Sequence, residues 1–323
     1  MMSNASAAER LTFRDCYEDT DSFEQALLDG LSAKQKAIPC RFLYDKRGSE
    51  LFDRICTLPE YYPTRTETAI LKAHAADVAG HIGPRACVVE LGSGSSTKTR
   101  ILLGALDAPD CYAPVDVSRE HLRQAAASIA RDYPRLRVEA ICADYSADFA
   151  LPEGDGRTAA FFPGSTIGNL TRREAHALLS HWRRKLGADG LMVLGVDLKK
   201  DAATLEAAYD DSEGVTEAFI KNILVRANTE LGADFNVKSF AYEARWREEP
   251  GRVEMHLRSV RDQVVTMGRA RIPLEAGERI HVENSHKYTV AEAVELGRMA
   301  GFAPVACFTD AAKRFSVHVW AAA

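Results

Sequence analysis

Residues 88–98 read Val88-Val89-Glu90-Leu91-Gly92-Ser93-Gly94-Ser95-Ser96-Thr97-Lys98. A short apolar strand ends in an acid and a Gly-x-Gly turn, and the residues after the turn suit a helix. Glycine tolerates positive φ and lets the backbone approach a ligand closely, so the run is typical of a nucleotide pocket at the carboxyl edge of a parallel sheet. It is not a dinucleotide-binding pattern, because Thr97 replaces the third glycine. A tight strand-to-helix turn without a ligand is the alternative interpretation.

Length and composition are those of an ordinary enzyme, with neither an extreme net charge nor a long apolar stretch. Its 323 residues suffice for two domains or one large one. The formal charge of −5 argues against a large nucleic-acid face, and no apolar stretch reaches membrane-spanning length. Residues 1–10 contain no signal-peptide core, and we expect them to be frayed. The seven cysteines form no C-x-x-C pair, so we expect reduced thiols in a cytoplasmic, monomeric protein.

Apolar runs alternate with amphipathic segments through the middle of the chain. This alternation predicts an α/β, doubly wound parallel sheet with crossover helices. Ahead of it we expect helices at 21–34 and 66–79. The predicted strands are 86–91, 111–117, 136–143, 158–163 and 190–197, and the predicted helices between them are 97–106, 118–132 and 171–186.

The pattern changes after Asp197. A helix is expected at 213–231, followed by strands at 252–261, 263–272 and 279–285, and the doubly wound pattern resumes with a helix at 289–300 and strands at 303–308 and 314–320. The sheet domain is therefore predicted to be interrupted by an insertion that packs with the N-terminal segment. The predicted domains are 68–197 with 289–323, and a discontinuous second, substrate-binding domain, 10–67 with 198–288.

Three predicted strand ends carry matching chemistry. The first is the glycine loop 92–94, the second is Asp116, and the third is Asp144. An acid at position 116 can accept both hydroxyls of a ribose, and Asp144 is placed to receive an adenine amino group while Tyr145 covers the ring. A strand-end Asp taken alone is more often a helix cap, so the prediction depends on all three together. They favour a nucleoside ligand over a bare phosphate.

The E-x-G-x-G strand end without phosphate-binding chemistry resembles the S-adenosylmethionine (SAM) loop of class I methyltransferases. The final helix, the Ala300-Gly301-Phe302 turn and the closing hairpin resemble the end of their sheet. The resemblance implies SAM as the cofactor. A slightly acidic pocket suits its positive sulfonium.

Longer runs resemble a more specific family, the histidine Nα-methyltransferases of ergothioneine biosynthesis. The resemblance covers nearly the whole chain. It is carried by the runs YDKRGSELFD at 44–53, LPEYYPTRTE at 58–67, FPGSTIGN at 162–169, GVDL at 195–198, AYDD at 208–211, ELGADF at 230–235 and ENSHKY at 283–288.

The resemblance implies three successive methyl transfers from SAM to the α-amine of L-histidine, giving hercynine without a metal. Tyr61 and Asn169 are the residues it assigns to catalysis. The substrate residues it implies are Asn169 and Tyr209 for the carboxylate, Tyr61 and the Gly164 backbone beside the amine, Glu283 and Ser285 for the imidazole, and Met255 and Phe52 packed around the ring. The cofactor residues it implies are Tyr44, Gly92, Lys98, Asp116, Asp144 and Tyr145, the last at a position where the family commonly has Phe.

Strand periodicity bears on the ring pocket independently. Glu283 and Ser285 are two residues apart, so we expect them to share a face of their strand, with Ile280 and Val282 on the opposite, core face. A carboxylate beside a hydroxyl suits the two nitrogens of an imidazole. Without the resemblance, Met255 would be interpreted as core packing and Glu283 as a surface acid.

Two other functions stay open. A methyltransferase of the same family could act on another amino acid such as tryptophan or a prenylated indole, although an indole offers Glu283 one donor and no second partner. A nucleoside-binding regulatory module without catalysis is the alternative from a different class. No dedicated base for the amine stands out, so a tyrosine or a water are the candidates.

Overall fold

The computed structural model describes residues 10–17, 22–94 and 96–323. The predicted frayed start, apart from Arg10, lies outside these ranges. The described chain forms two compact units, each built from separate segments. The sheet unit comprises 10–17, 63–199 and 288–323, and the second unit comprises 22–62 and 200–287.

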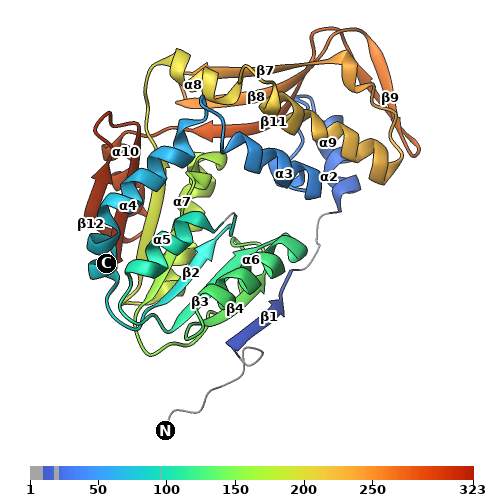
Figure 1. Cartoon of the computed structure of the whole chain (residues 1–323). Helices are drawn as coiled ribbons and strands as arrows, with labels where there is room; N and C mark the ends of the chain where they lie inside the picture. Colours follow the sequence, from blue (N-terminus) through green and yellow to red (C-terminus); the bar gives the residue numbers. More distant parts are fainter. Residues whose placement is uncertain (1–9, 18–21, 95) are drawn as a thin grey trace. The chain divides into compact units, whose positions relative to one another are not determined.

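The sheet unit contains one eight-stranded sheet in the order β1-β4-β3-β2-β5-β6-β13-β12 (Figure 1). Its strands are β1 (Leu11–Asp15), β2 (Cys87–Leu91), β3 (Cys111–Asp116), β4 (Arg137–Cys142), β5 (Thr158–Phe162), β6 (Leu191–Asp197), β12 (Phe302–Thr309) and β13 (Phe315–Ala322). The pairs from β1 to β6 are parallel, and β13 lies antiparallel to both β6 and β12. The strand order reverses between β2 and β5, which confirms the doubly wound prediction.

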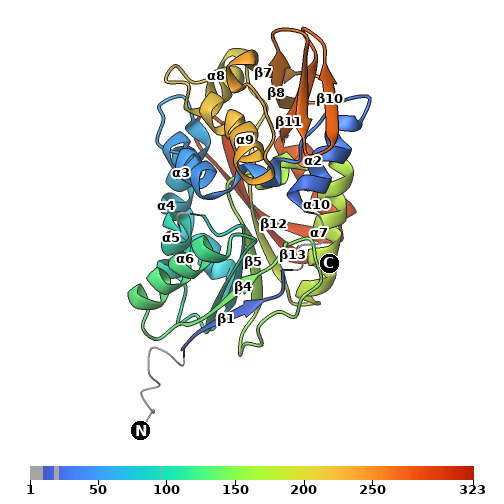
Figure 2. The same cartoon turned by 90° about the vertical axis from the view of Figure 1, so that its right-hand side faces the viewer.

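Helices cover both faces of this sheet (Figure 2). On one face the buried side chains of α4 (Tyr62–Ile82), α5 (Thr97–Ala105) and α6 (Arg119–Asp132) join those of the strands in one core. On the other face α7 (Arg172–Leu186) and α10 (Val290–Met299) do the same. Val88 lies in the first core and its neighbour Val89 in the second, because successive strand residues point to opposite faces.

The N-terminal strand β1 corrects one predicted domain boundary. The predicted second domain begins at residue 10, whereas β1 pairs in parallel with β4, with Leu11 opposite Val138. Its side chains are only partly buried, since it is an edge strand. Such a strand shows little alternation in its sequence, and its partner lies more than a hundred residues away.

The second unit combines a three-stranded antiparallel sheet, in the order β11-β8-β7, with helices and a separate hairpin (Figure 1). The strands are β7 (Phe240–Arg247), β8 (Arg252–Ser259), β9 (Gln263–Met267), β10 (Ala270–Leu274) and β11 (Arg279–His286). The helical segments are α2 (Phe23–Ser32), η1 (Cys40–Leu43), α3 (Lys46–Ile55), α8 (Ala202–Tyr209), α9 (Val215–Leu231) and η3 (Val237–Ser239). Their buried side chains form a single core.

Some elements of this unit were not predicted, and one prediction was wrong. The missed elements are the helices α3 and α8, the short helices η1 and η3, and the strand β7. The strand expected at 263–272 is a hairpin instead, because Gly268 adopts a φ of 56° and reverses the chain between β9 and β10. Within the described ranges, none of the helices combines the length and apolar character needed to cross a bilayer.

Candidate active site

The carboxyl ends of three neighbouring strands meet along one edge of the sheet unit. The Gly92 N–H donates to the Val115 carbonyl at 2.9 Å, which ties the glycine turn after β2 to the end of β3. The Ala143 N–H donates to the Asp116 carbonyl at 3.1 Å, which ties the end of β4 to β3. The backbone therefore brings Gly92, Asp116 and Asp144 to one edge, beside the strand-order reversal where doubly wound sheets bind ligands.

The acid of the glycine motif, Glu90, joins three elements inside the fold. Its two carboxylate oxygens each lie 2.8 Å from the Thr99 hydroxyl of α5, and the Tyr112 hydroxyl of β3 also donates to it. Burial raises the pKa of Glu90 to about 7, although the Tyr112 and Thr99 hydrogen bonds oppose the shift. Glu90 thus orients α5 behind the turn, where Gly92 takes a φ of 76°.

The two strand-end aspartates also stabilise their own turns. Asp116 Oδ1 accepts the Ser118 N–H at 2.9 Å, and Asp144 Oδ1 accepts the Ser146 N–H at 2.8 Å. These bonds to the residue two positions on form turns rather than helix caps, since α6 has Ser118 as its N-cap and no helix follows Asp144. A carboxylate has about four acceptor sites, so the turn bonds leave capacity for a ligand. Burial raises the pKa of Asp116, while the Ser118 N–H opposes that shift.

A buried glutamate on α4 connects the predicted cofactor residue Lys98 to the loop after β5. Lys98 Nζ lies 2.5 Å from Glu67 Oε2, and the Gly164 N–H donates to the same oxygen at 2.8 Å. Glu67 is 1% exposed. It packs against Gly195 of β6, where an added β-carbon would lie 2.0 Å from its Oε1. One carboxylate thus sets the positions of a side chain predicted to bind the cofactor and a backbone group predicted to lie beside the substrate.

The loop after β5 takes an unusual backbone path towards Asn169. Gly164 and Ser165 have φ values of 82° and 58°, both in the left-handed region. Glycine adopts this conformation freely, but Ser165 keeps it only where the surroundings hold it. Here the Gly164 N–H is bound to Glu67, and the Ser165 hydroxyl accepts the Asp197 N–H at 2.9 Å. The short helix η2 (Thr166–Asn169) then ends at Asn169.

The second unit gathers the predicted aromatic residues into one chain of ring contacts. Tyr44 lies 5.6 Å from Phe52 between ring centroids, Phe52 lies 6.4 Å from Tyr61, and Tyr61 lies 5.9 Å from Tyr209. Phe219 of α9 contacts both Tyr44 and Phe52. Aromatic rings in edge-on and tilted contact present apolar surfaces with electron-rich faces.

A β-bulge in β11 decides which way Glu283 faces. His281 pairs with His256 of β8, yet Glu283 pairs with Met255, the next residue along β8. From one of these pairs to the next, β11 therefore moves on by two residues while β8 moves on by one. The extra residue, Val282, shifts the alternation of the strand by one position.

Because of this shift, Glu283 and Ser285 face the core. Ile280 pairs with Leu257, which shares a face of β8 with Met255. Glu283, opposite Met255, therefore lies on the same face as Ile280. The prediction that Glu283 and Ser285 share a face is confirmed, but the prediction that Ile280 lies on the opposite face is wrong. Regular alternation does not anticipate a bulge.

The carboxylate of Glu283 lies in a desolvated, hydroxyl-rich environment. It is 7% exposed. Burial raises its pKa to about 8, and the charge of Lys287 opposes that shift. Beside it, the hydroxyls of Tyr209 and Ser285 lie 2.8 Å apart. Lys287, itself 0% exposed, donates to both of them.

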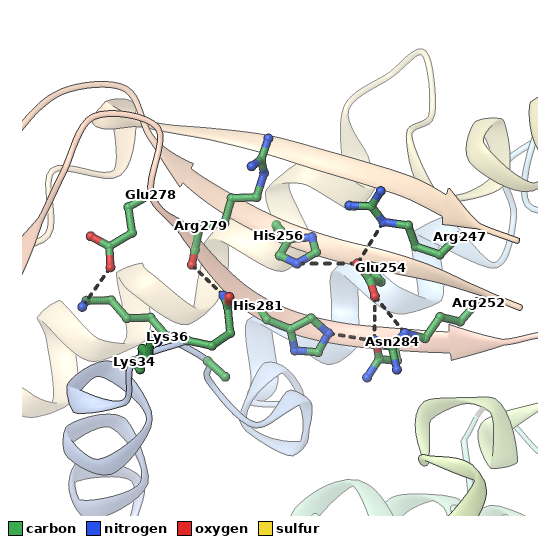
Figure 3. A pocket seen from close by; sticks show the side chains of 12 residues that line it. Lys34, Lys36, Arg247, Arg252, Glu254, His256, Glu278, Arg279, His281 and Asn284 are labelled. Atoms are coloured by element: carbon green, nitrogen blue, oxygen red, sulfur yellow. Dashed lines mark hydrogen bonds and ion pairs between the residues drawn. The ribbon is translucent and has the colours of Figure 1, made fainter. Parts of the chain in front are cut away.

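The other face of this sheet carries a separate hollow of about 580 Å³ (Figure 3). Its lining contains ion pairs such as Arg252–Glu254 and Lys36–Glu278. Among the described residues, its lining contains none of the predicted site residues. It consists of Lys34, Gln35, Lys36, Ala37, Arg247, Arg252, Glu254, His256, Glu278, Arg279, His281 and Asn284. The hollow is therefore distinct from the face that carries Glu283.

The structure distributes the predicted residues over both units. The sheet unit carries Gly92, Lys98, Asp116, Asp144, Tyr145, Gly164 and Asn169, and the second unit carries Tyr44, Phe52, Tyr61, Tyr209, Met255, Glu283 and Ser285. Each unit thus holds residues assigned to both ligands. Direct contacts join Lys98 to Gly164 through Glu67 in one unit, and Tyr61 to Ser285 through Tyr209 in the other.

Several residues that contact the predicted ones were not predicted from the sequence. Glu67, Phe219 and Lys287 are three of them. Glu67 and Lys287 lie within the sequence runs that carry the family resemblance. Charged residues inside those runs could therefore have been proposed as site residues. Phe219 belongs to a helix with a continuous apolar pattern, in which nothing distinguishes a pocket residue from a core residue.

Comparison with known proteins identifies relatives over nearly the whole chain. Residues 23–322 match the family model described as "Histidine-specific methyltransferase, SAM-dependent". Histidine N-alpha-methyltransferase of Mycolicibacterium smegmatis is 39% identical over 295 residues, and that of Mycobacterium tuberculosis is 41% identical over 301 residues. Each alignment covers 90% of this chain and 92% of the relative. Ergothioneine biosynthesis protein 1 of Neurospora crassa is 34% identical across 85% of this chain and 32% of its own length.

Proposed function

The chain belongs to the histidine-specific, SAM-dependent methyltransferases, and on this premise we propose that it methylates the α-amine of L-histidine three times to give hercynine, the first step of ergothioneine biosynthesis. The observation that carries the proposal is the arrangement, in the second unit, of the residues predicted to bind the imidazole ring. There Glu283 and Ser285 share one buried face, Met255 lies opposite Glu283, and Tyr209 contacts Ser285.

The donor set of the sheet unit fits SAM. Asp116 offers acceptors for ribose hydroxyls, Asp144 for the adenine amino group, and Tyr145 an aromatic surface, while the turn at Gly92 admits close backbone approach. Lys98, held by Glu67, supplies a cation suited to the carboxylate of the methionine moiety. When bound, SAM supplies an electrophilic methyl group on a positive sulfonium. Tyr44 completes the proposed cofactor set.

The protein residues contribute positioning rather than covalent chemistry. We assign Asn169 and Tyr209 to the substrate carboxylate, and Tyr61 with the Gly164 backbone to the amine. Phe52 and Met255 pack the ring. Orientation of this kind can lower a barrier by roughly 7–11 kcal/mol in favourable cases. A desolvated amine loses its proton more readily, and the ring of Tyr61 can face the methylated cation as it grows.

The proposal assigns complementary tasks to the two units. The sheet unit would hold the cofactor, and the second unit would read the side chain of the amino acid. We also propose a monomeric, cytoplasmic enzyme. The seven cysteines are all free thiols, which supports a reducing compartment. Light scattering of the purified protein tests the monomer.

A mass-spectrometric assay of SAM with each amino acid in turn tests the reaction. We expect histidine to gain three methyl groups and tryptophan to react far less, because an indole leaves Glu283 or Ser285 without its partner. Recovery of only monomethylated histidine with excess SAM at long times would contradict trimethylation. Preferential methylation of tryptophan would support the alternative substrate.

A further inference from the structure

The hollow of about 580 Å³ lies on the face of the three-stranded sheet that points away from the core of the second unit (Figure 3). Strand pairing places its side chains in rows, with His281 opposite His256 and Asn284 opposite Glu254. The Lys36 carbonyl accepts the His281 N–H at 2.9 Å and so fixes the segment before η1 along the edge of β11. The hollow thus belongs to one unit, and backbone hydrogen bonds hold its border in place.

The lining of this hollow carries a surplus of positive charge, although the whole chain has a formal charge of −5. Two lysines and three arginines face two glutamates, which leaves three positive charges unbalanced. Glu254 accepts hydrogen bonds from Arg252 at 2.6 Å and from Arg247 at 3.3 Å, so two guanidinium groups share one carboxylate. The other glutamate, Glu278, pairs with Lys36.

The acid next to the lining does not remove this surplus. Glu243 of β7, which pairs with His256 of β8, accepts hydrogen bonds from Arg258 at 2.6 Å and from Arg279 at 2.8 Å. Arg245 lies 3.3 Å from the same carboxylate. Burial opposes the shift, but the hydrogen bonds from these arginines lower the pKa of Glu243 to about 2. Three guanidinium groups therefore surround one carboxylate, and this face of the sheet stays cationic.

Two uncharged histidines separate the cationic ends of the hollow. Figure 3 shows His256 and His281 between Arg279 at one end and Arg252 at the other. Burial lowers the pKa of both histidines, that of His256 to about 4, so neither adds charge at neutral pH. Within the described ranges, His256 is 8% exposed and its Nδ1 has no hydrogen-bond partner. Buried polar atoms are normally paired, so this nitrogen points to a partner that the protein does not supply.

We propose that this hollow is a second binding site, which takes a small molecule with two or more negative charges on phosphate or carboxylate groups. Guanidinium groups present parallel N–H donors that match either oxyanion, and the unbalanced charge exceeds what a single negative charge can offset. The volume falls within the roughly 300–1,000 Å³ of small-molecule sites. Because Met255 and Glu283 lie on the opposite face of the sheet, this site is separate from the one assigned to histidine.

Calorimetry of the full chain with sodium pyrophosphate and, separately, with citrate tests the proposal. The titrations are made at neutral pH and low salt, with S-adenosylhomocysteine present so that the cofactor site is filled. We expect saturable binding of at least one anion, weakened by sodium chloride because salt screens the charges. Tighter binding of pyrophosphate would identify a phosphate ligand, and tighter binding of citrate a carboxylate ligand. Absence of saturable binding of both up to about 10 mM would overturn the proposal.

Charge reversals test whether the anion binds in the hollow. The double variant Lys34→Glu/Arg247→Glu changes two exposed cations of the lining. The control Arg54→Glu/Arg269→Glu makes the same change in net charge at two exposed positions of the same unit outside the lining. We expect the lining variant to weaken anion binding about tenfold or more, and the control to weaken it less than about threefold. Equal losses would show a response to net charge alone and would overturn the proposal.

NMR of histidine-labelled wild-type protein gives a measurement that depends on no folded variant. We expect the ring signals of His256 to shift as the anion is added, with the same saturation as the calorimetric titration. His74 of α4 in the sheet unit is the internal control, and its signals should stay in place. Unshifted His256 signals while the anion binds would locate the anion elsewhere and overturn the proposal.

Discussion

Glu67 and Gly195 are in direct contact, because the carboxylate of Glu67 occupies the space that any side chain at position 195 would need. A β-carbon added to Gly195 would lie 2.0 Å from Glu67 Oε1. The same carboxylate binds Lys98 and the Gly164 N–H. A glycine in the middle of a buried strand therefore sets the position of two groups that we assign to the active site.

We expect Gly195→Ala to lower the free energy of unfolding by roughly 1–3 kcal/mol, the usual cost of overpacking a core. Because the added methyl group displaces Glu67, we also expect weaker cofactor binding. Denaturant unfolding and calorimetry with S-adenosylhomocysteine measure the two effects. Gly80→Ala is the control, since no atom lies near its added β-carbon and alanine favours the helix. Unchanged cofactor affinity in Gly195→Ala would separate Glu67 from cofactor binding.

Glu67→Gln keeps an acceptor for the Gly164 N–H but replaces the charged partner of Lys98 with an amide. We expect affinity for S-adenosylhomocysteine to fall about tenfold, and Lys98→Met to add little further loss when both changes are combined. The matched control is Glu139→Gln, which alters an ion-paired carboxylate on β4 of the same unit. Fully additive losses would show that Glu67 does not act through Lys98.

Asp116→Ala should weaken cofactor binding far more than histidine binding measured with S-adenosylhomocysteine present. Hydrogen bonds from two ribose hydroxyls to a carboxylate are worth roughly 1.5–3 kcal/mol. Asp132→Ala is the control, because Asp132 is an exposed partner of Arg100 in the same unit, where such pairs contribute about 0–1 kcal/mol. Unaltered cofactor affinity in Asp116→Ala would remove Asp116 from the site and leave it as a turn residue.

Glu283→Ala should reduce kcat/KM for histidine several-fold to several hundred-fold, by roughly 1.5–3 kcal/mol. Activity towards phenylalanine and tryptophan should fall less, or rise, because the buried acid no longer disfavours apolar rings. Adding Met255→Val should widen the pocket further. Kinetics with all three amino acids measure the effect, and a uniform loss across them would mean that Glu283 only supports the fold.

The raised pKa of Glu283, about 8, predicts a pH dependence with a defined sign. Glu283 keeps its proton in the folded protein well above its ordinary pKa of 4.5, so the ligand-free protein should lose stability as pH rises from about 4.5 to about 8. Glu283→Gln should lack this component. Histidine affinity should show the reverse trend through pH 8 as the carboxylate forms. Parallel pH profiles for wild type and Glu283→Gln would refute both expectations.

The local sequence determined most of the sheet unit. Each parallel strand from β2 to β6 is a short apolar run bounded by polar turns, and each crossover helix has its own periodicity, so no long-range information is needed to recognise them. The glycine turn and the strand-end acids Asp116 and Asp144 could likewise be placed on one edge, because parallel strands end on the same side of a sheet.

Only the tertiary structure decided the contacts that set the chemistry. The bulge at Val282 reverses the faces on which the following residues of β11 lie. Such a one-residue shift cannot be recognised from hydrophobic alternation. The contact between Glu67 and Gly195 joins positions 128 residues apart, and the burial of Lys287 depends on the hydroxyls of Tyr209 and Ser285 reaching it from another element. From the sequence alone, a charged residue is predicted to be exposed. Its burial costs free energy that only partners brought together by folding can offset, so the prediction changes only when those partners are known.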